Sequence, residues 1–126
     1  MTINKAIENL RYYSDLIDQE KARGGMFFNG CKERSELLKR DLQELGIDAR
    51  LLYVTSSTGF LTPENGAFWT NHYCVIDYPS STVYDPSYTK KKPVDIREYP
   101  ELYFEKDSLL FHIEQSNGSF ARYLTN

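Results

Sequence analysis

Residues 48–55 are apolar on both alternating sides of an extended chain and read DARLLYVT. A strand of this kind has to be covered on both faces, whereas a half-exposed strand alternates apolar and polar residues. The segment therefore predicts a strand in the centre of a β-sheet. Because 126 residues are the size of one compact domain, we expect a single domain over residues 1–126 with one core.

Two helical patterns precede this strand. Apolar residues recur at steps of three and four over residues 3–20, and leucines do so over residues 31–45, where charged side chains occupy most of the other face. Gly46 follows the second pattern at the position of a C-terminal helix cap. Between the two patterns, residues 24–30 hold three glycines and predict a loop. Cys31 then falls in the first turn of the second helix.

Strand patterns fill most of the remaining chain. Residues 69–78 and 82–84 predict one hairpin. Residues 108–115 and 119–125 predict another around Asn117-Gly118, which is a strong hairpin signal. Two helices followed by about five strands predict an α+β domain in which helices pack on one mostly antiparallel sheet.

Three connecting segments have recognisable patterns. Residues 56–67 form a polar loop of about a dozen residues, and loops of this length are often functional, so we expect a lid or a wall of a substrate site. Residues 89–93 read TKKKP and predict a solvated basic turn. Residues 100–104 predict a short helical turn.

Composition argues against several classes of partner. The chain has 15 Lys and Arg against 18 Asp and Glu, and these charges are interspersed, which is not typical of nucleic-acid or anionic-membrane binding. No apolar run approaches the ~20 residues of a membrane-spanning helix, and the N-terminus lacks the apolar stretch of a secretory signal. We therefore expect a protein that is cytoplasmic as synthesised, and the sequence predicts no oligomeric state.

No cofactor or metal ion is expected. The only histidines are His72 and His112, and the CxxC, HxxxH and HExxH spacings of metal sites are absent. The phosphate-binding patterns GxGxxG and GxxxxGKS or GxxxxGKT are absent as well. Cys31 and Cys74 are too few for a disulfide scaffold, and we expect both to be thiols.

Cys31, His72 and Asp85 form the one set of residues with a reactive pattern. The partial positive charge of a helix N-terminus favours the thiolate, which is the nucleophilic form of cysteine. His72 on a strand can take the thiol proton and return it to a leaving amine, while Asp85 on the next strand can hold the imidazole in one tautomer. The pattern predicts nucleophilic catalysis by Cys31.

Two hairpin registers leave the geometry of His72 and Asp85 open. A four-residue turn at residues 77–80 pairs His72 directly with Asp85, with Cβ atoms roughly 4.5–5.5 Å apart. A turn centred on residues 80–81 pairs His72 with Thr89 instead. The sequence does not select between these registers.

The same residues resemble the transglutaminase-like branch of the papain-like cysteine protease superfamily. That family has Gly-Cys at a helix start, a helix ending in Leu-Gly-Ile-x-Ala-Arg before a strand, a His strand and then Asp-Pro. The matching segments, in chain order, are residues 30–31, 45–52, 72–77 and 84–86. The resemblance implies a papain-like, transglutaminase-like core with Cys31 as nucleophile, His72 as base and acid, and Asp85 as the residue that orients His72.

The resemblance also implies an acyl-transfer enzyme that acts on a carboxamide of a protein or peptide. Hydrolysis, by a peptidase, amidase or glutamine deamidase, is favoured over crosslinking, and a bacterial effector or toxin is one form that such a domain can take. The main-chain N–H of Cys31 is one expected oxyanion donor, and Asn29 and Trp69 are candidates for the second. Asn29 can equally be only a helix cap, and Trp69 only a packing residue.

A non-enzymatic alternative stays open. A domain of the same fold can bind a peptide without catalysis, using the loop at residues 56–67 and the aromatic side chains of Phe60 and Phe68. Cys74 is expected to be a packing residue, because free cysteine is among the most buried residue types. His112 lies in an apolar strand and is expected to be a packed or surface histidine rather than a base. Reactivity of the Cys31 thiol that depends on His72 separates an enzyme from a binding domain.

Overall fold

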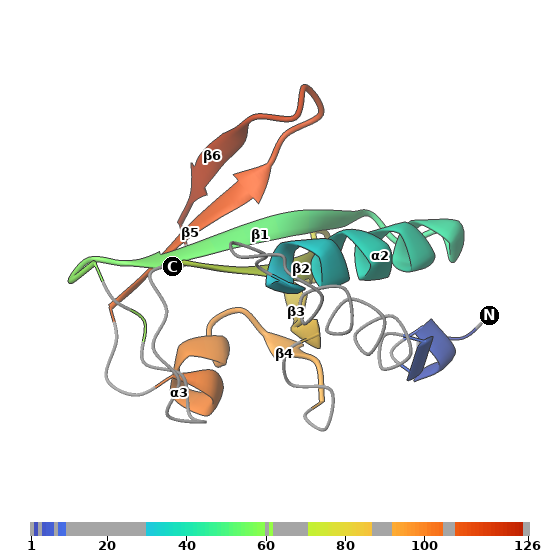
Figure 1. Ribbon diagram of the computed structural model, residues 1–126, viewed down its shortest axis with the longest axis horizontal. Helices are drawn as coiled ribbons and strands as arrows, with labels where there is room; N and C mark the ends of the chain where they lie inside the picture. The colour runs from blue at the N-terminus through green and yellow to red at the C-terminus, as the bar shows by residue number, and fades with distance from the viewer. Residues whose placement is uncertain are drawn as a thin grey trace, which may run out of the picture.

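The computed structural model of the protein describes residues 2, 4–6, 8–9, 30–59, 61, 71–86, 92–104 and 108–124. These residues form an α+β fold with one sheet of six strands (Figure 1). The elements are α2 (Gly30–Glu44), β1 (Ala49–Ser56), β2 (His72–Asp77), β3 (Thr82–Tyr84), β4 (Val94–Asp95), α3 (Tyr99–Tyr103), β5 (Leu109–Glu114) and β6 (Phe120–Tyr123).

The sheet has the strand order β4-β3-β2-β1-β5-β6, and each neighbouring pair is antiparallel. β1 lies between β2 and β5, as predicted from residues 48–55. Its successive side chains Leu51 and Leu52 are both buried, one on each face, which is why this strand shows no polar alternation. The two-residue strand β4 was not predicted, because a segment of this length carries no periodicity.

The second predicted helix is confirmed as α2. The chain leaves the helix at Gly46, whose φ of +83° is the left-handed conformation favoured by glycine at a helix end. There the N–H of Ile47 donates to the carbonyl of Leu42 at 3.1 Å, which satisfies one of the last helical acceptors. The predicted turn at residues 100–104 is confirmed as α3, shifted by one residue.

Several predicted segments lie mostly outside the described residues. Of the first predicted helix, residues 4–6 and 8–9 are helical. Of the expected loop at residues 24–30, only Gly30 is described, and there the prediction is wrong because Gly30 is the first residue of α2; most of the loop at 56–67 lies outside as well. Within that second loop, Ser56 is the last residue of β1 and Leu61 is fully buried.

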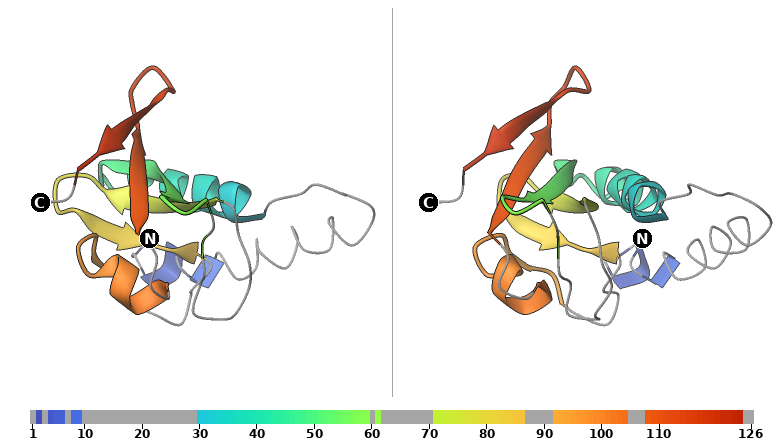
Figure 2. Two further views of the ribbon diagram at one scale, coloured as in Figure 1. Left: turned by 90° about the vertical axis from the view of Figure 1, so that its left-hand side faces the viewer. Right: turned by 60° about the vertical axis from the view of Figure 1, so that its left-hand side comes forward.

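The core has two layers, one on each face of the sheet. Leu38 and Leu42 of α2 pack against Ala49, Val75 and Tyr84 on one face. On the other face, α3 and its flanks pack against the sheet, and Figure 2 shows α2 and α3 separated by the strands. The buried side chains of this second layer are Leu52, Val54, Leu61, Cys74, Ile76, Val83, Ile96, Tyr99, Phe104, Phe111 and Ile113.

The hairpin of β2 and β3 follows neither of the two predicted registers. Asp77 pairs with Thr82 and Val75 with Tyr84, so that one further step places Cys74, not His72, opposite Asp85. The turn does hold four residues, 78–81, but it lies one residue later than in the first alternative. Ser81 makes this turn possible because it adopts a left-handed φ of 57°. The resulting shift of two residues keeps His72 and Asp85 on the same face.

The C-terminal hairpin is confirmed around Asn117-Gly118. Gly118 has a φ of +85°, and the N–H of Gln115 donates to the carbonyl of Ser119 at 2.7 Å. The pair β5 and β6 extends away from the rest of the molecule in Figure 1. Among the described residues, no helix combines the length and the apolar character needed to cross a membrane.

Candidate active site

The structure brings Cys31, His72 and Asp85 together from three elements. Cys31 is the second residue of α2, His72 is the first residue of β2, and Asp85 follows directly after β3. All three are buried. They meet at the end of the sheet where the first turn of α2 reaches the start of β2. The two candidate oxyanion donors, Asn29 and Trp69, lie outside the described residues.

His72 and Asp85 form a buried hydrogen-bonded pair. Nε2 of His72 lies 2.8 Å from Oδ2 of Asp85, and the two side chains are 1% and 0% exposed. The contact is diagonal across the hairpin, since Asp85 lies opposite Cys74, and a diagonal neighbour on one face is within reach of long side chains. Because Asp85 engages Nε2, Nδ1 is the ring nitrogen that remains for the thiol of Cys31.

The protonated form of His72 is favoured. Burial lowers the pKa of this imidazole, but the charge of Asp85 and its hydrogen bond outweigh burial, and hydrogen bonding and charge interaction with Cys31 act in the same direction. The net result raises the pKa of His72 from 6.5 to about 9. At neutral pH the site therefore holds a His72 imidazolium beside Asp85 and Cys31.

Tyr99 is a member of this site that the sequence did not predict. Its hydroxyl donates to Oδ2 of Asp85, the same oxygen that contacts His72, and the side chain is fully buried. Burial and the nearby charge of Asp85 raise the pKa of Tyr99 well above its usual value, so the hydroxyl stays protonated as a donor. Nothing local marks Tyr99 among ten tyrosines, because its partner lies 14 residues away.

Cys74 of β2 lies opposite Asp85 in the hairpin register. It is fully buried, as expected of a packing residue, and it is close enough to Tyr99 to affect the pKa of that hydroxyl. Burial and the charge of Asp85 raise the pKa of Cys74 well above its usual value. Cys74 is therefore a neutral thiol in the core next to the site. Both cysteines are free of disulfide bonds.

Two further contacts hold the reactive groups in position. The hydroxyl of Ser35, one helical turn after Cys31, donates to the main-chain carbonyl of Tyr73 at 3.1 Å and ties α2 to β2 next to His72. The ring of Phe104 lies 6.2 Å from the His72 ring in an edge-on arrangement and 5.5 Å from the Tyr99 ring. Phe104 therefore places an apolar surface against the His72–Asp85 pair, where few waters can compete for its hydrogen bonds.

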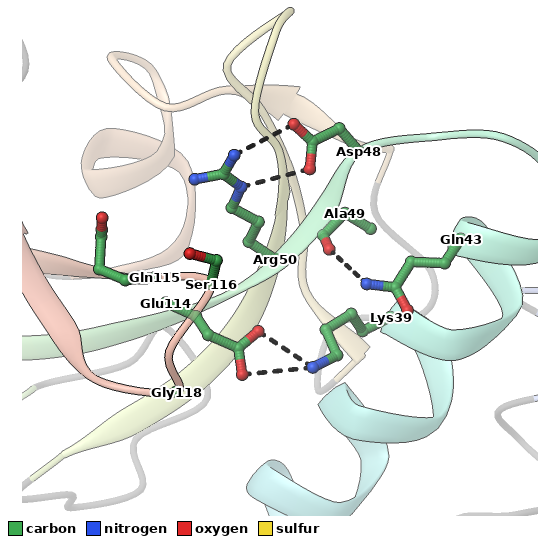
Figure 3. Close-up of a pocket in the computed structure, with 9 residues that line it drawn as sticks. All are labelled: Lys39, Gln43, Asp48, Ala49, Arg50, Glu114, Gln115, Ser116 and Gly118. Atoms are coloured by element: carbon green, nitrogen blue, oxygen red, sulfur yellow. Dashed lines mark hydrogen bonds and ion pairs between the residues drawn. The ribbon is translucent and has the colours of Figure 1, made fainter.

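A separate polar pocket lies beside the C-terminal half of α2, away from Cys31 (Figure 3). It has a volume of about 350 Å³. Lys39 Nζ lies 3.0 Å from a carboxylate oxygen of Glu114, and Arg50 Nε lies 3.2 Å from one of Asp48. Since these charges on its walls are paired with one another, the pocket has no excess charge that would select a ligand.

His112 is the second histidine of the chain. His112 is half-buried on β5, with its ring 6.0 Å from that of Tyr53, and it takes no part in the site around Cys31. Within the described ranges, no group of three or more histidine, cysteine, aspartate or glutamate side chains is placed to hold a metal ion.

Comparison with known proteins gives no family for this chain. No family model, no curated protein and no solved structure matches it. A function for this chain therefore has to be inferred from the geometry of the site itself.

Proposed function

We propose that the protein is a cysteine-dependent acyl-transfer enzyme that acts on a carboxamide of a protein or peptide through Cys31, His72 and Asp85. The observation that carries the proposal is the buried 2.8 Å contact between His72 and Asp85, with Cys31 close enough to raise the pKa of the same imidazole. A nucleophile, a base and an orienting carboxylate in this order are the groups that thiol catalysis needs. The proposed core is papain-like and transglutaminase-like.

The raised pKa of His72 favours a mechanism that begins from an ion pair. The proton of the Cys31 thiol rests on His72, and the thiolate attacks the carbonyl carbon of the substrate. His72 then donates this proton to the nitrogen of the leaving amine or ammonia as the carbon–nitrogen bond breaks, which leaves a thioester on Cys31. A water molecule, deprotonated by the now neutral His72, attacks the thioester and releases the acid and the thiol.

Asp85 and Tyr99 have distinct tasks in this mechanism. Asp85 stabilises the imidazolium by charge and fixes its orientation through Nε2, which leaves Nδ1 as the nitrogen that can exchange a proton with the thiol. Tyr99 binds the same carboxylate oxygen and limits its movement. Tyr99 is a positioning residue, since its contact is with Asp85 rather than with the reacting atoms.

The first turn of α2 supplies one oxyanion donor in this proposal. The first N–H groups of a helix have no intrahelical acceptor, and the main-chain N–H of Cys31 belongs to this group. It can therefore donate to the oxygen that becomes negative as the thiolate attacks. Asn29 and Trp69 stay candidates for the second donor.

Thiol alkylation tests the proposal before a substrate is known. In a Cys74→Ser background only Cys31 reacts, and we expect iodoacetamide to alkylate it at pH 6.5 faster than it alkylates a free thiol, whose pKa is about 8.5. His72→Gln should abolish this advantage, whereas the matched control His112→Gln should keep it.

Equal, slow alkylation in all three proteins would overturn the catalytic proposal. A peptide-binding domain without catalysis would then describe the chain better. Fast alkylation that depends on His72 justifies a screen of peptide amides and glutamine-containing proteins, with release of ammonia separating deamidation from cleavage of the main chain.

A further inference from the structure

A row of four side chains crosses the sheet beside the candidate nucleophile. Tyr73 of β2 lies directly opposite Tyr53 of β1, Tyr53 opposite His112 of β5, and His112 opposite Arg122 of β6. Directly opposed residues project from the same face, which is the face that α2 covers through Val75. Three strand spacings of ~4.8 Å give the row a length of about 14 Å.

The inner end of the row adjoins the first turn of α2. Nζ of Lys32 lies 5.8 Å from the centre of the Tyr73 ring, and the carbonyl of Tyr73 accepts the Ser35 hydroxyl. Tyr73 also follows His72 directly in the chain. Burial raises the pKa of Tyr73, and the charges of Tyr53, Cys31 and Glu36 add to this effect, which agrees with a position close to Cys31.

The row presents an aromatic surface that reaches solvent. The rings of Tyr53 and Tyr73 lie 4.9 Å apart, and the ring of Phe120 lies 6.2 Å from the first and 6.3 Å from the second. Phe120 is 37% exposed, which is unusual for a phenylalanine that touches two other rings. We call Tyr53, Tyr73 and Phe120 the aromatic platform.

A cation lies at each end of the row. Lys32 and Arg122 are exposed, and within the described part of the chain neither forms an ion pair with a carboxylate. The nearest carboxylate of β5, Glu114, is occupied by Lys39 at 3.0 Å, as Figure 3 shows. The outer end of the row is therefore suited to an acidic group.

We propose that the aromatic platform binds an aromatic side chain of the peptide substrate next to the reacting residue, and that Arg122 pairs with a carboxylate about three residues further along that peptide. This inference rests on the proposed function, because continuity with Cys31 identifies the occupant as substrate. An extended peptide advances about 3.4 Å per residue, so three residues span about 10 Å, which matches the two strand spacings from Tyr53 to Arg122.

A binding experiment tests this inference separately from catalysis. The probes are the peptides acetyl-Gln-Phe-Gly-Ser-Glu-amide and its reversed sequence, each compared with versions that carry Ala for Phe or Lys for Glu. They are titrated into the isotopically labelled Cys31→Ser protein, which cannot turn them over, and dissociation constants are read from amide chemical shifts.

For the forward or the reversed sequence, or for both, the Phe version should bind roughly three- to tenfold more tightly than the Ala version. This is the size expected of an aromatic contact. The Glu version should bind roughly two- to fivefold more tightly than the Lys version; the effect is small because Arg122 is exposed. Phe120→Ala should remove the first preference and Arg122→Glu should reverse the second. Tyr78→Ala, which removes a 42% exposed aromatic side chain away from the row, should leave both unchanged.

Equal affinity for the Phe and Ala peptides in both directions would overturn the inference, as would shifts that fall outside the row. Tighter binding of adenosine monophosphate than of the Phe peptide at the same rings would also overturn it, because the platform would then select a base. The alkylation of Cys31 is measured independently, so failure of the platform and failure of the proposed enzyme give different results.

Discussion

The buried pair of His72 and Asp85 predicts how the stability of the protein depends on pH. The pKa of His72 is raised from 6.5 to about 9 in the folded state, while an unfolded histidine titrates near 6.5. A group whose folded pKa is raised stabilises the fold most below its unfolded pKa. Its contribution is then lost as the pH rises toward the folded pKa.

The two pKa values set the magnitude of this effect. Their difference corresponds to about 3 kcal/mol at low pH, and about 2 kcal/mol of this is lost between pH 6 and pH 8. The side chain is 1% exposed, so water does not screen the pair. The window ends at pH 8 because unfolded thiols begin to ionise above it.

Urea denaturation at several pH values measures the loss directly. In the Cys74→Ser background we expect the free energy of unfolding to fall by about 2 kcal/mol from pH 6 to pH 8, and His112→Gln to keep this fall. Asp85→Asn should flatten it, since the charge that raises the pKa of His72 is gone.

Asp85→Asn also removes one partner of a buried pair and can prevent folding. A second measurement therefore follows the imidazole of His72 by NMR in the His112→Gln protein, which has one histidine. A His72 ring that titrates near pH 6.5, together with an unfolding free energy that is constant from pH 6 to pH 8, would refute the reasoning.

Three further substitutions test two contacts around the site and the packing of α2 on the sheet. Tyr99→Phe should lower the free energy of unfolding by about 2 kcal/mol in urea denaturation, because Asp85 loses a donor while the ring remains; no loss would contradict the contact. Ser35→Ala should cost about 1 kcal/mol and slow the alkylation of Cys31, whereas the exposed control Ser80→Ala should change neither; equal alkylation rates would show that this bond does not position α2. Leu42→Ala should cost roughly 2–5 kcal/mol in thermal or urea unfolding because the side chain is fully buried under the sheet, and a cost near zero would contradict its packing.

Local sequence patterns predicted most of the helices and strands among the described residues. The helix at residues 31–45 and the strand at 48–55 appear as α2 and β1, each within one residue of the prediction. Both were predictable because periodicity records which faces of an element are covered, and the glycine at position 46 marks where the helix ends. The C-terminal hairpin followed from the turn residues Asn117 and Gly118 for the same local reason.

The sequence predicted the residues of the site better than it predicted the contacts between them. Cys31, His72 and Asp85 were selected by chemistry and by their positions along the chain, and the structure places all three together. Neither predicted register of the hairpin was correct. Alternation specifies the face of a strand but not its partner, and the actual shift of two residues preserves the face.

By itself, the sequence determined the α+β character of the chain, the central strand and the three reactive groups, because each of these depends on residue types at short separations. Only the tertiary structure decided that Asp85 lies diagonally from His72, that Tyr99 holds the same carboxylate oxygen, and that the aromatic platform forms beside Cys31. These features join residues from different elements. Their contacts depend on strand register and on how the two layers pack against the sheet, and no local pattern records either.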